Sequence, residues 1–405
     1  MIAATLRGLT MDARLGLAGC LLLGTLGIVP TGGGAPPPPA APRARDLGIP
    51  FVGTPGPLNA ITDVAGVEVG FTTIVEGEGA LQVGKGPVRT GVTAVLPRGR
   101  KALGAVFGAY AVGNGNGEMT GTLWIEESGL VTTPILITNT HSVGVVRDAV
   151  VEWLVRKGAT EQLWGLPIVA ETWDGYLNDL NGFHVRREHA FAALDGARGG
   201  PVAEGNVGGG TGMHTFEFKG GTGTASRRVR VKAVGDYTVG VLVQSNFGRR
   251  WQLQVAGVPV GREWPEDAPF TAEYGRPNEL GSIIVVIATD APLLPTQLKR
   301  IATRAAMGIS RTGGTAGNGS GDIFVAFSTA NAAAASADAG LQQAAFLPND
   351  QLDGLFESTV LAVEESIVNA MVAARTMTGV DGHRLVAIDH ARLQRILEQY
   401  RRLER

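Results

Sequence analysis

The pair Gly281-Ser282 is the part of this sequence best suited to nucleophilic chemistry. It ends a non-periodic segment, Gly257–Gly281, and begins an apolar run that predicts a strand, Ser282–Ala288. Glycine leaves its carbonyl unshielded, so the serine hydroxyl can attack that carbonyl and transfer the chain from nitrogen to oxygen. Hydrolysis then frees an N-terminal serine whose α-amine, with an ordinary pKa of about 7.7 to 8.0, can act as base for its own hydroxyl. Gly-Ser pairs also occur in ordinary turns, so this pattern alone leaves both interpretations open.

Other routes to hydrolysis have less support in the sequence. No GxSxG elbow occurs, which disfavours an α/β-hydrolase. The histidines form no HExxH or comparable ligand spacing and none lies near a serine-glycine signature, which disfavours a metal site and a Ser-His-Asp triad. They are His141, His184, His189, His214, His383 and His390. The single cysteine, Cys20, lies in the first apolar stretch, so we expect no disulfide, thiolate metal site or cysteine nucleophile in the folded body.

Three glycine-rich strings invite comparison with phosphate-binding loops: Gly113–Gly117, Gly205–Gly212 and Gly313–Gly321. A Walker loop ends in Lys-Ser/Thr, and none of the three does. A dinucleotide fingerprint needs a strand before it and a helix after it, whereas the third string precedes a strand. We interpret all three as turn glycines, with the shaping of a pocket wall as the alternative role.

Short β-rich runs, glycine turns and helical patterns predict a layered α/β body around these residues. The expected strands are Val92–Leu96, Ala105–Tyr110, Thr133–Thr138, Tyr237–Gln244, Ser282–Ala288 and Ile323–Phe327. The expected helices are Val143–Arg156, Pro295–Ile309, Gln351–Arg375 and Ala391–Arg401.

The first residues have the pattern of a secretory signal peptide. Arg7 and Arg14 precede an apolar run, Leu15–Val29, that is too short to span a bilayer. We therefore expect a periplasmic or secreted protein with no membrane association after signal removal. A Leu-Ala-Gly-Cys string ending at Cys20 resembles a lipoprotein box, but too little apolar sequence precedes it, so lipid anchoring is less favoured. An over-predicted start codon, and hence a cytoplasmic protein, is the other alternative.

Composition limits the class of ligand. The 405 residues contain 37 acids and 35 bases, for a net charge of -2, and there is no long Lys/Arg run. This balance gives no electrostatic reason to expect nucleic acid or acidic membranes as partners. With 44% hydrophobic residues the chain can bury a large core, so we expect a folded protein with a small-molecule ligand.

Longer strings around Ser282 resemble one known family. GSIIVVIATDAPLLPTQLKRIATRAAMGISRTGG, from Gly281, and NGSGDIFVAFSTAN, from Asn318, are similar to the DmpA-type N-terminal-nucleophile aminopeptidases. That family includes L-aminopeptidase/D-esterases and β-peptidyl aminopeptidases. The similarity extends upstream through Asn59–Thr73, Thr90–Gly99, Glu171–Val185, Gly205–Met213 and Val241–Gly248. It covers nearly all of the chain from Asp46 to the C-terminal helices.

The resemblance implies how the candidate nucleophile works. Ser282 matches the family nucleophile, which becomes the first residue of a small chain after cleavage between Gly281 and Ser282. Ser320 and Asp322 match the serine and the acid of an NGSG-acid motif. Ser320 would contact the nucleophile or its amine, and Asp322 would orient them. Some relatives have glutamate at the acid position, and the shorter aspartate leaves the fit of this contact open.

The resemblance also implies the residues that bind substrate. Asn246 matches an asparagine that donates to the oxyanion, and Glu171 matches an acid that holds the free ammonium of the substrate. Trp173 departs from relatives that have tyrosine in this ETxDG motif, where the hydroxyl assists the oxyanion. Tyr176 is an alternative donor, and Trp173 has lining the pocket as its other role. Taken singly, each residue also has a structural interpretation, such as a turn amide for Asn246.

The resemblance implies a layered α-β-β-α sandwich of the DmpA/ornithine acetyltransferase type, self-cleaved into two chains. We expect a signal peptide and Pro/Gly-rich linker over residues 1–45, a large chain over 46–281 and a small chain over 282–405. The two chains would form one layered domain that assembles into a homo-oligomer, with the tetramers of relatives as the precedent.

The expected function is that of a self-processing serine aminopeptidase without metal or cofactor, acting on short peptides, aminoacyl amides or esters. An acyltransferase related to ornithine acetyltransferase is the alternative, although that family uses threonine where this chain has Ser282. A binding protein without activity is a third class, which the complete set of matched site residues disfavours.

Overall fold

The computed structural model describes residues 42–160, 163–270, 281–335 and 340–404. Two sheets form the centre of the part from Ala41 onward. The four-stranded sheet has the order β1 (Glu68–Glu76), β2 (Val88–Leu96), β5 (Ile135–Asn139), β6 (Ile168–Thr172). The six-stranded sheet has the order β4 (Leu130–Val131), β3 (Val106–Gly115), β12 (Ser320–Ser328), β11 (Gly281–Thr289), β10 (Gly235–Asn246), β9 (Gly221–Val231). All six strands predicted from the sequence lie in these sheets, with ends that differ by a few residues.

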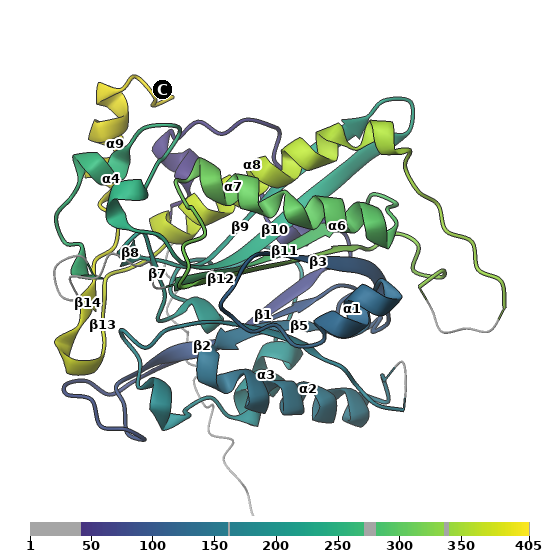
Figure 1. The fold of residues 1–405 in the computed structure, drawn as a ribbon, viewed down its shortest axis with the longest axis horizontal. Coiled ribbons are helices and arrows are strands. Elements are labelled where there is room, and N and C mark those ends of the chain that lie inside the picture. Colours follow the sequence, from purple (N-terminus) through teal and green to yellow (C-terminus); the bar gives the residue numbers. More distant parts are fainter. Residues whose placement is uncertain (1–41, 161–162, 271–280, 336–339, 405) are drawn as a thin grey trace, which may run out of the picture. The chain divides into compact units, whose positions relative to one another are not determined.

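Helices cover one face of each sheet (Figure 1). On the four-stranded sheet lie α2 (Val143–Lys157) and α3 (Arg187–Asp195), and on the six-stranded sheet α6 (Pro295–Thr303) and α8 (Asp353–Val372), with α7 (Ala305–Arg311) packed on α8. The smaller elements are α1 (Thr122–Ser128), α4 (Val260–Glu263), α9 (His390–Gln399), and the two-residue strands β7 (His214–Thr215), β8 (Phe218–Lys219), β13 (Met377–Thr378) and β14 (Arg384–Leu385). The molecule is therefore a mixed α/β protein, as the sequence predicts.

One predicted helix is divided in two. The expected helix Pro295–Ile309 breaks at Arg304, which separates α6 from α7. The amide of Arg304 bonds to the carbonyl of Ile301, three residues back, so the helix tightens there instead of continuing. Beyond the break, Gly308 lies so close to Val363 of α8 that a side chain at position 308 would collide with it. The break thus lets α7 pack directly on α8.

The alternation of side chains along β11 decides which way the candidate nucleophile points. Ile283, Val285 and Ile287 belong to the core beneath α6 and α8. Ile284 and Val286 belong to a second core, shared with strands of the four-stranded sheet. Because successive residues of a strand point to opposite faces, Ser282 lies on the face turned toward the four-stranded sheet.

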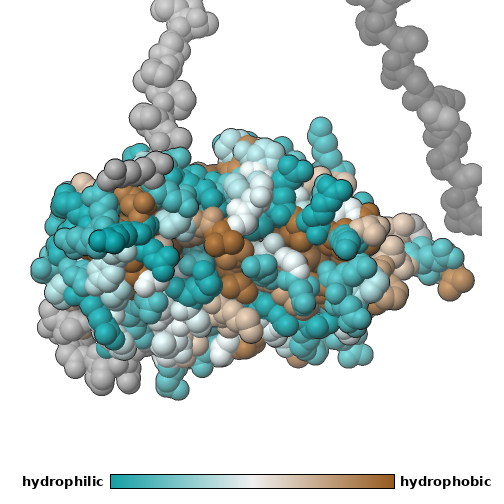
Figure 2. Space-filling view, turned by 90° about the horizontal axis from the view of Figure 1, so that it is seen from above, coloured by the Kyte–Doolittle hydropathy of each residue, from teal (hydrophilic) through white to brown (hydrophobic). Residues whose placement is uncertain are grey.

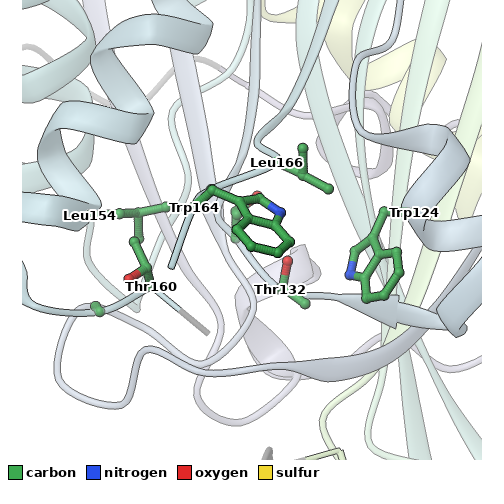
Figure 3. Close-up of a pocket in the computed structure, with 9 residues that line it drawn as sticks. Trp124, Thr132, Leu154, Thr160, Trp164 and Leu166 are labelled. Atoms are coloured by element: carbon green, nitrogen blue, oxygen red, sulfur yellow. The ribbon is translucent and has the colours of Figure 1, made fainter. Parts of the chain in front are cut away.

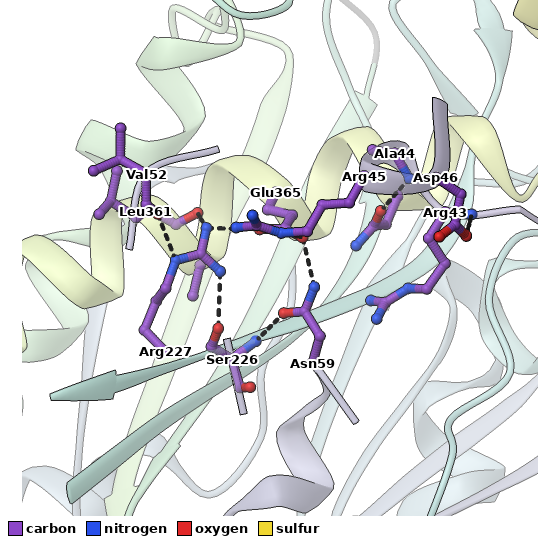
Figure 4. Close-up of polar contacts among 12 residues, drawn as sticks. Arg43, Ala44, Arg45, Asp46, Val52, Asn59, Ser226, Arg227, Leu361 and Glu365 are labelled. Carbon is purple, nitrogen blue, oxygen red and sulfur yellow. Dashed lines mark hydrogen bonds and ion pairs between the residues drawn. The ribbon is translucent and has the colours of Figure 1, made fainter. Parts of the chain in front are cut away.

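The folded body begins earlier than the sequence suggests. Arg43 and Arg45 were expected in a linker that ends at residue 45, but both pack against the body (Figure 4). Arg43 pairs with Glu204 at 2.7 Å and Arg45 pairs with Glu365 of α8 at 2.8 Å. Ala44 between them is fully buried. These partners are distant in sequence, so local composition gives no sign of the contacts; the predicted signal peptide and Cys20 lie outside the described residues.

One face of the molecule can be followed in a space-filling view. Figure 2 shows a face that is largely hydrophilic, with hydrophobic areas in several separate places. Among the described residues, no helix is long and apolar enough to cross a membrane.

Candidate active site

Ser282 is the second residue of β11 and is 4% exposed. Its hydroxyl donates a hydrogen bond of 2.7 Å to the carbonyl oxygen of Gly281. The Oγ atom therefore lies beside the carbonyl group that it would attack in self-cleavage.

Gly281 is held in place by close contact between backbones. A Cβ atom at this position would lie 2.2 Å from the carbonyl oxygen of Asn246 and 2.9 Å from the Cα of Phe247. Neither atom belongs to a flexible side chain, so any larger residue would push β11 away from β10. Glycine is thus required by packing at the position where the sequence predicts an unshielded carbonyl.

Asn246 is the last residue of β10 and pairs directly with Ser282 in the antiparallel ladder. Its Oδ1 accepts a bond of 2.9 Å from the amide of His214, and its Nδ2 donates one of 2.8 Å to the carbonyl of Trp173. These partners fix which end of the carboxamide is nitrogen. An asparagine Nδ2 has two hydrogens, and among the described residues only one of them has an acceptor. The second is left to donate to another group.

Ser320 and Asp322 lie on the other side of β11, at the start of the parallel strand β12. Ser320 Oγ donates to Asp322 Oδ1 at 2.6 Å, and both residues are buried. Their neighbour Phe324 packs in the core beneath α6 and α8, so strand alternation turns both side chains to the face opposite to that of Ser282 Oγ. The main chain of Ser282 is consequently nearer to this pair than its hydroxyl is.

Glu171 lies on β6 of the other sheet and is 3% exposed. Burial raises the pKa of its carboxyl, and hydrogen bonds from the Thr140 hydroxyl and the Glu118 amide partly oppose that rise. A desolvated carboxylate of this kind is stabilised by an added cation. Glu171 is therefore suited to hold an ammonium group.

A cavity of about 270 Å³ is lined by residues from both sheets. Its lining residues are Asn116, Thr140, Glu171, Trp173, Gly281, Ser282 and Gly319. It places the candidate nucleophile and the candidate ammonium site around one space of a size that fits a small ligand. Ser320, Asp322 and Asn246 are not among its described lining residues.

The two aromatic candidates have different positions. Trp173 lines the cavity, and its carbonyl holds Asn246. Tyr176 packs instead against Phe270 and stacks on His383 with ring centroids 4.5 Å apart. It is not among the described residues that line the cavity, so the structure brings Trp173, but not Tyr176, to the wall of the site.

The sequence analysis did not single out several residues of the wall. Thr140 follows the expected strand Thr133–Thr138, and Asn116 and Gly319 lie in two of the glycine strings. Position next to a strand end was the only available signal for Thr140. Two of the three glycine strings thus contribute to the pocket wall, the role held as the alternative to simple turns.

Another crevice lies between α1, the end of α2 and two short stretches, residues 159–160 and 164–166 (Figure 3). Trp124, Trp164 and Leu154 are among its lining residues, none of which is ionisable. Its volume of about 10 Å³ accommodates roughly one water molecule, so it is no candidate for a substrate site. Within the described part of the chain, no group of three or more His, Cys, Asp or Glu residues could hold a metal ion.

Comparison with known proteins decides what kind of enzyme has this arrangement. The sequence signature of peptidase family S58 matches residues 59–385. The chain belongs to peptidase family S58. It is 57% identical to the β-peptidyl aminopeptidase BapA of Sphingosinicella microcystinivorans, over 89% of this chain and 93% of that protein. It is 50% identical to the β-peptidyl aminopeptidase BapA of Sphingosinicella xenopeptidilytica, over 89% of this chain and 92% of that protein.

Solved structures of S58 relatives have the same fold. The L-aminopeptidase D-Ala-esterase/amidase of Ochrobactrum anthropi, described as a variant of the Ntn hydrolase fold, superposes with a TM-score of 0.83 at 49% identity. The match covers 89% of this chain and 99% of that one. The PH0078 protein of Pyrococcus horikoshii superposes with a TM-score of 0.81 at 44% identity, over 89% of this chain and 100% of that one. The resemblance seen in the sequence and the predicted aminopeptidase function are confirmed, and the acyltransferase alternative finds no support.

Proposed function

We propose that this S58 peptidase is a self-processing serine aminopeptidase in which Ser282 is the nucleophile. The observation that carries the proposal is that Ser282 and the buried acid Glu171 face one cavity from opposite sheets. A substrate whose ammonium binds at Glu171 would present its first carbonyl near Ser282. Only the first residue of a peptide has a free ammonium beside its carbonyl, so this spacing selects for release of N-terminal residues.

Self-processing uses the contact between Ser282 Oγ and Gly281. The hydroxyl oxygen attacks the Gly281 carbonyl carbon, the C–N bond breaks, and the hydroxyl proton moves to the Ser282 nitrogen. Water then hydrolyses the ester, which leaves a carboxylate on Gly281 and a free hydroxyl and α-amine on Ser282. The products are a large chain that ends at Gly281 and a small chain that begins at Ser282.

Peptide hydrolysis reuses the same hydroxyl. The α-amine of Ser282 accepts the hydroxyl proton while Oγ attacks the substrate carbonyl, and the protonated amine then protonates the leaving amine. The unused N–H of Asn246 donates to the oxyanion, since Asn246 and Ser282 are directly paired. Ser320 and Asp322 act on the α-amine, because their side chains lie on the face away from Oγ. Water finally hydrolyses the ester and releases the amino acid.

The relatives suggest the substrate class. Two are β-peptidyl aminopeptidases with at least 50% identity, and the Ochrobactrum relative is an L-aminopeptidase and D-Ala-esterase/amidase. We favour β-aminoacyl amides and short β-peptides as preferred substrates, with L-α-aminoacyl and D-alanyl compounds as the alternatives.

The chains, the layers and the location belong to the same proposal. The two chains would remain together as one four-layered α-β-β-α sandwich, since β11 of the small chain lies between β10 and β12. The apolar run Leu15–Val29 supports export to the periplasm or medium.

A substrate panel with Glu171→Gln tests the proposal. The wild-type enzyme should cleave free-amine β-aminoacyl p-nitroanilides and leave their N-acetyl analogues intact, because acetylation removes the cation that pairs with Glu171. Glu171→Gln should lower kcat/KM for the free-amine substrate by about 100-fold while cleavage at Ser282 continues. Burial raises the pKa of Glu171, so the fall of kcat/KM at acid pH should occur at a higher pH than the pKa of an exposed glutamate. Glu171→Gln should remove this acid-side fall.

Glu118→Gln is the matched control, because Glu118 bonds to Glu171 through its main-chain amide, and its exposed carboxylate acts on Glu171 only through a weaker charge repulsion. It should change kcat/KM less than threefold or so. Efficient turnover of the N-acetyl substrate would contradict the assignment of Glu171.

A further inference from the structure

Lys219 is a fully buried lysine that the proposed mechanism does not use. It lies on β8, directly opposite His214 of β7, in a short hairpin. Among the described residues, no carboxylate pairs with it. Its Nζ contacts three main-chain carbonyl oxygens: Met213 at 2.7 Å, Gly220 at 2.8 Å and Gly210 at 3.5 Å.

A buried ammonium without an acid is costly, and an apolar side chain of the same length would avoid that cost. Desolvation by burial lowers the pKa of Lys219 to about 7. In return, the Lys219 Nζ donates hydrogen bonds that hold the turn from Gly210 to Met213. The same bonds link Met213 and Gly220, the residues that flank the two strands of the hairpin. Met213 O also accepts the Gly220 amide at 3.0 Å, so the lysine reinforces a contact on which the hairpin depends.

The residue after this turn holds Asn246. His214 follows Met213, and its amide is the donor that fixes Asn246 Oδ1. The same hairpin is bonded to β10 through Thr215 Oγ1 to Ser245 O at 3.1 Å, and to Phe247, the residue after β10, through Phe216 N to Phe247 O at 2.7 Å. A shift of the Met213 carbonyl would therefore move the His214 amide and rotate the carboxamide of Asn246.

We propose that Lys219 is a positioning residue, which holds the turn at Met213 and His214 so that the free N–H of Asn246 points at the oxyanion. The inference rests on the proposed function, in that it takes Asn246 as an oxyanion donor. Lys219 itself touches neither Ser282 nor the described lining of the cavity.

A double-mutant cycle separates this role from a purely structural one. Lys219→Met should lower kcat by about tenfold or more with KM changed less than about threefold, since the contact that weakens is formed only in the transition state. In an Asn246→Ala background, which alone should lower kcat by about 100-fold, adding Lys219→Met should change kcat less than about twofold. Lys219→Gln keeps an N–H donor at this position, in the form of a side-chain amide, and should recover part of the kcat. If Lys219→Met does not fold, Lys219→Gln takes its place in the cycle.

Arg227→Lys is the matched control. Arg227 is also a buried cation bonded to main-chain carbonyls, those of Val52 and Ser226, but it lies beside α8. It should lower the melting temperature and leave kcat unchanged. If Lys219→Met lowered kcat by the same factor with and without Asn246→Ala, the positioning role of Lys219 would be refuted and the proposed function would stand. Full activity of Asn246→Ala would instead refute the oxyanion role of Asn246, and the inference with it.

Discussion

At the scale of single residues, the site depends on ionisable groups removed from water. In the proposed mechanism, Glu171 binds the substrate ammonium selectively because burial makes its charge costly in the absence of a cation. Asp174, three residues further on, is fully buried and follows the Trp173 carbonyl that holds Asn246. Burial raises the pKa of Asp174 to about 7, so its carboxyl keeps a proton to much higher pH than an exposed aspartate does. Burial thus raises the pKa of two carboxyls of the same motif, Glu171 and Asp174.

Asp174→Asn tests the neutral state of that carboxyl. Asp174 Oδ2 and Asn139 Oδ1 both lack a donor among the described residues, and a proton on Asp174 would supply one. The folded protein keeps this proton up to about pH 7, whereas the unfolded chain releases it near pH 4. The stability of the wild type therefore falls as pH rises from about 4 to 7 and stays low above that range. An asparagine keeps a donor at every pH.

The measurement is urea unfolding of the single-chain Ser282→Ala protein at pH 5 and pH 8. The gain in unfolding free energy from Asp174→Asn should be larger at pH 8 by about 2 to 3 kcal/mol. Asp236→Asn, at an exposed position paired with Arg230, should show no such pH-dependent difference. Equal effects of Asp174→Asn at both pH values would show that Asp174 is charged in the fold.

At the scale of elements, the short segment from Arg43 to Leu47 packs on α8, which lies beyond the proposed cleavage position (Figure 4). Glu365 of α8 forms ion pairs with Arg45 and with Arg227, the latter at 2.6 Å. It also accepts a hydrogen bond from the side-chain amide of Asn59. These contacts cross the proposed cleavage boundary. They would help to keep the two chains together after the Gly281-Ser282 bond is cut.

Arg43→Ala tests how strongly the segment is attached to the rest of the body through its other ion pair, with Glu204, a residue that precedes the proposed cleavage position. It leaves Glu204 buried without its cation, so unfolding free energy in the Ser282→Ala protein should fall by about 3 kcal/mol at pH 8. The loss should be smaller at pH 5, because burial raises the pKa of Glu204 to about 7 and the acid can become neutral. Adding Glu204→Gln should restore part of the loss, and Arg147→Ala, at an exposed ion pair, should cost less than about 0.5 kcal/mol. A loss below 1 kcal/mol for Arg43→Ala would show that the segment is not an anchor.

The sequence predicts those elements whose evidence is local. Buried strands such as β11 follow from a continuous run of β-branched residues, and Ser282 could be found because it heads such a run. Arg43, Thr140 and Lys219 could not be found in this way. Each acts on partners from other elements, and no periodicity or motif marks a lysine that bonds main-chain carbonyls or an arginine that meets a buried acid.

At the scale of the whole molecule, the two sheets have separate tasks. The six-stranded sheet brings Asn246, Ser282 and Ser320 together on three adjacent strands, and the four-stranded sheet brings Glu171 and Trp173. The core shared by the sheets sets the distance between Ser282 and Glu171. In the proposed mechanism, selection of N-terminal residues therefore depends on how the two sheets pack.

Intact mass under denaturing conditions tests the central claim most directly. An active preparation should contain two chains, the smaller running from Ser282 to Arg405. Ser282→Ala should give one uncleaved chain without peptidase activity, because a single hydroxyl performs both reactions. A wild-type enzyme that is active as one uncleaved chain, or a Ser282→Ala protein that still cleaves between residues 281 and 282, would contradict the account.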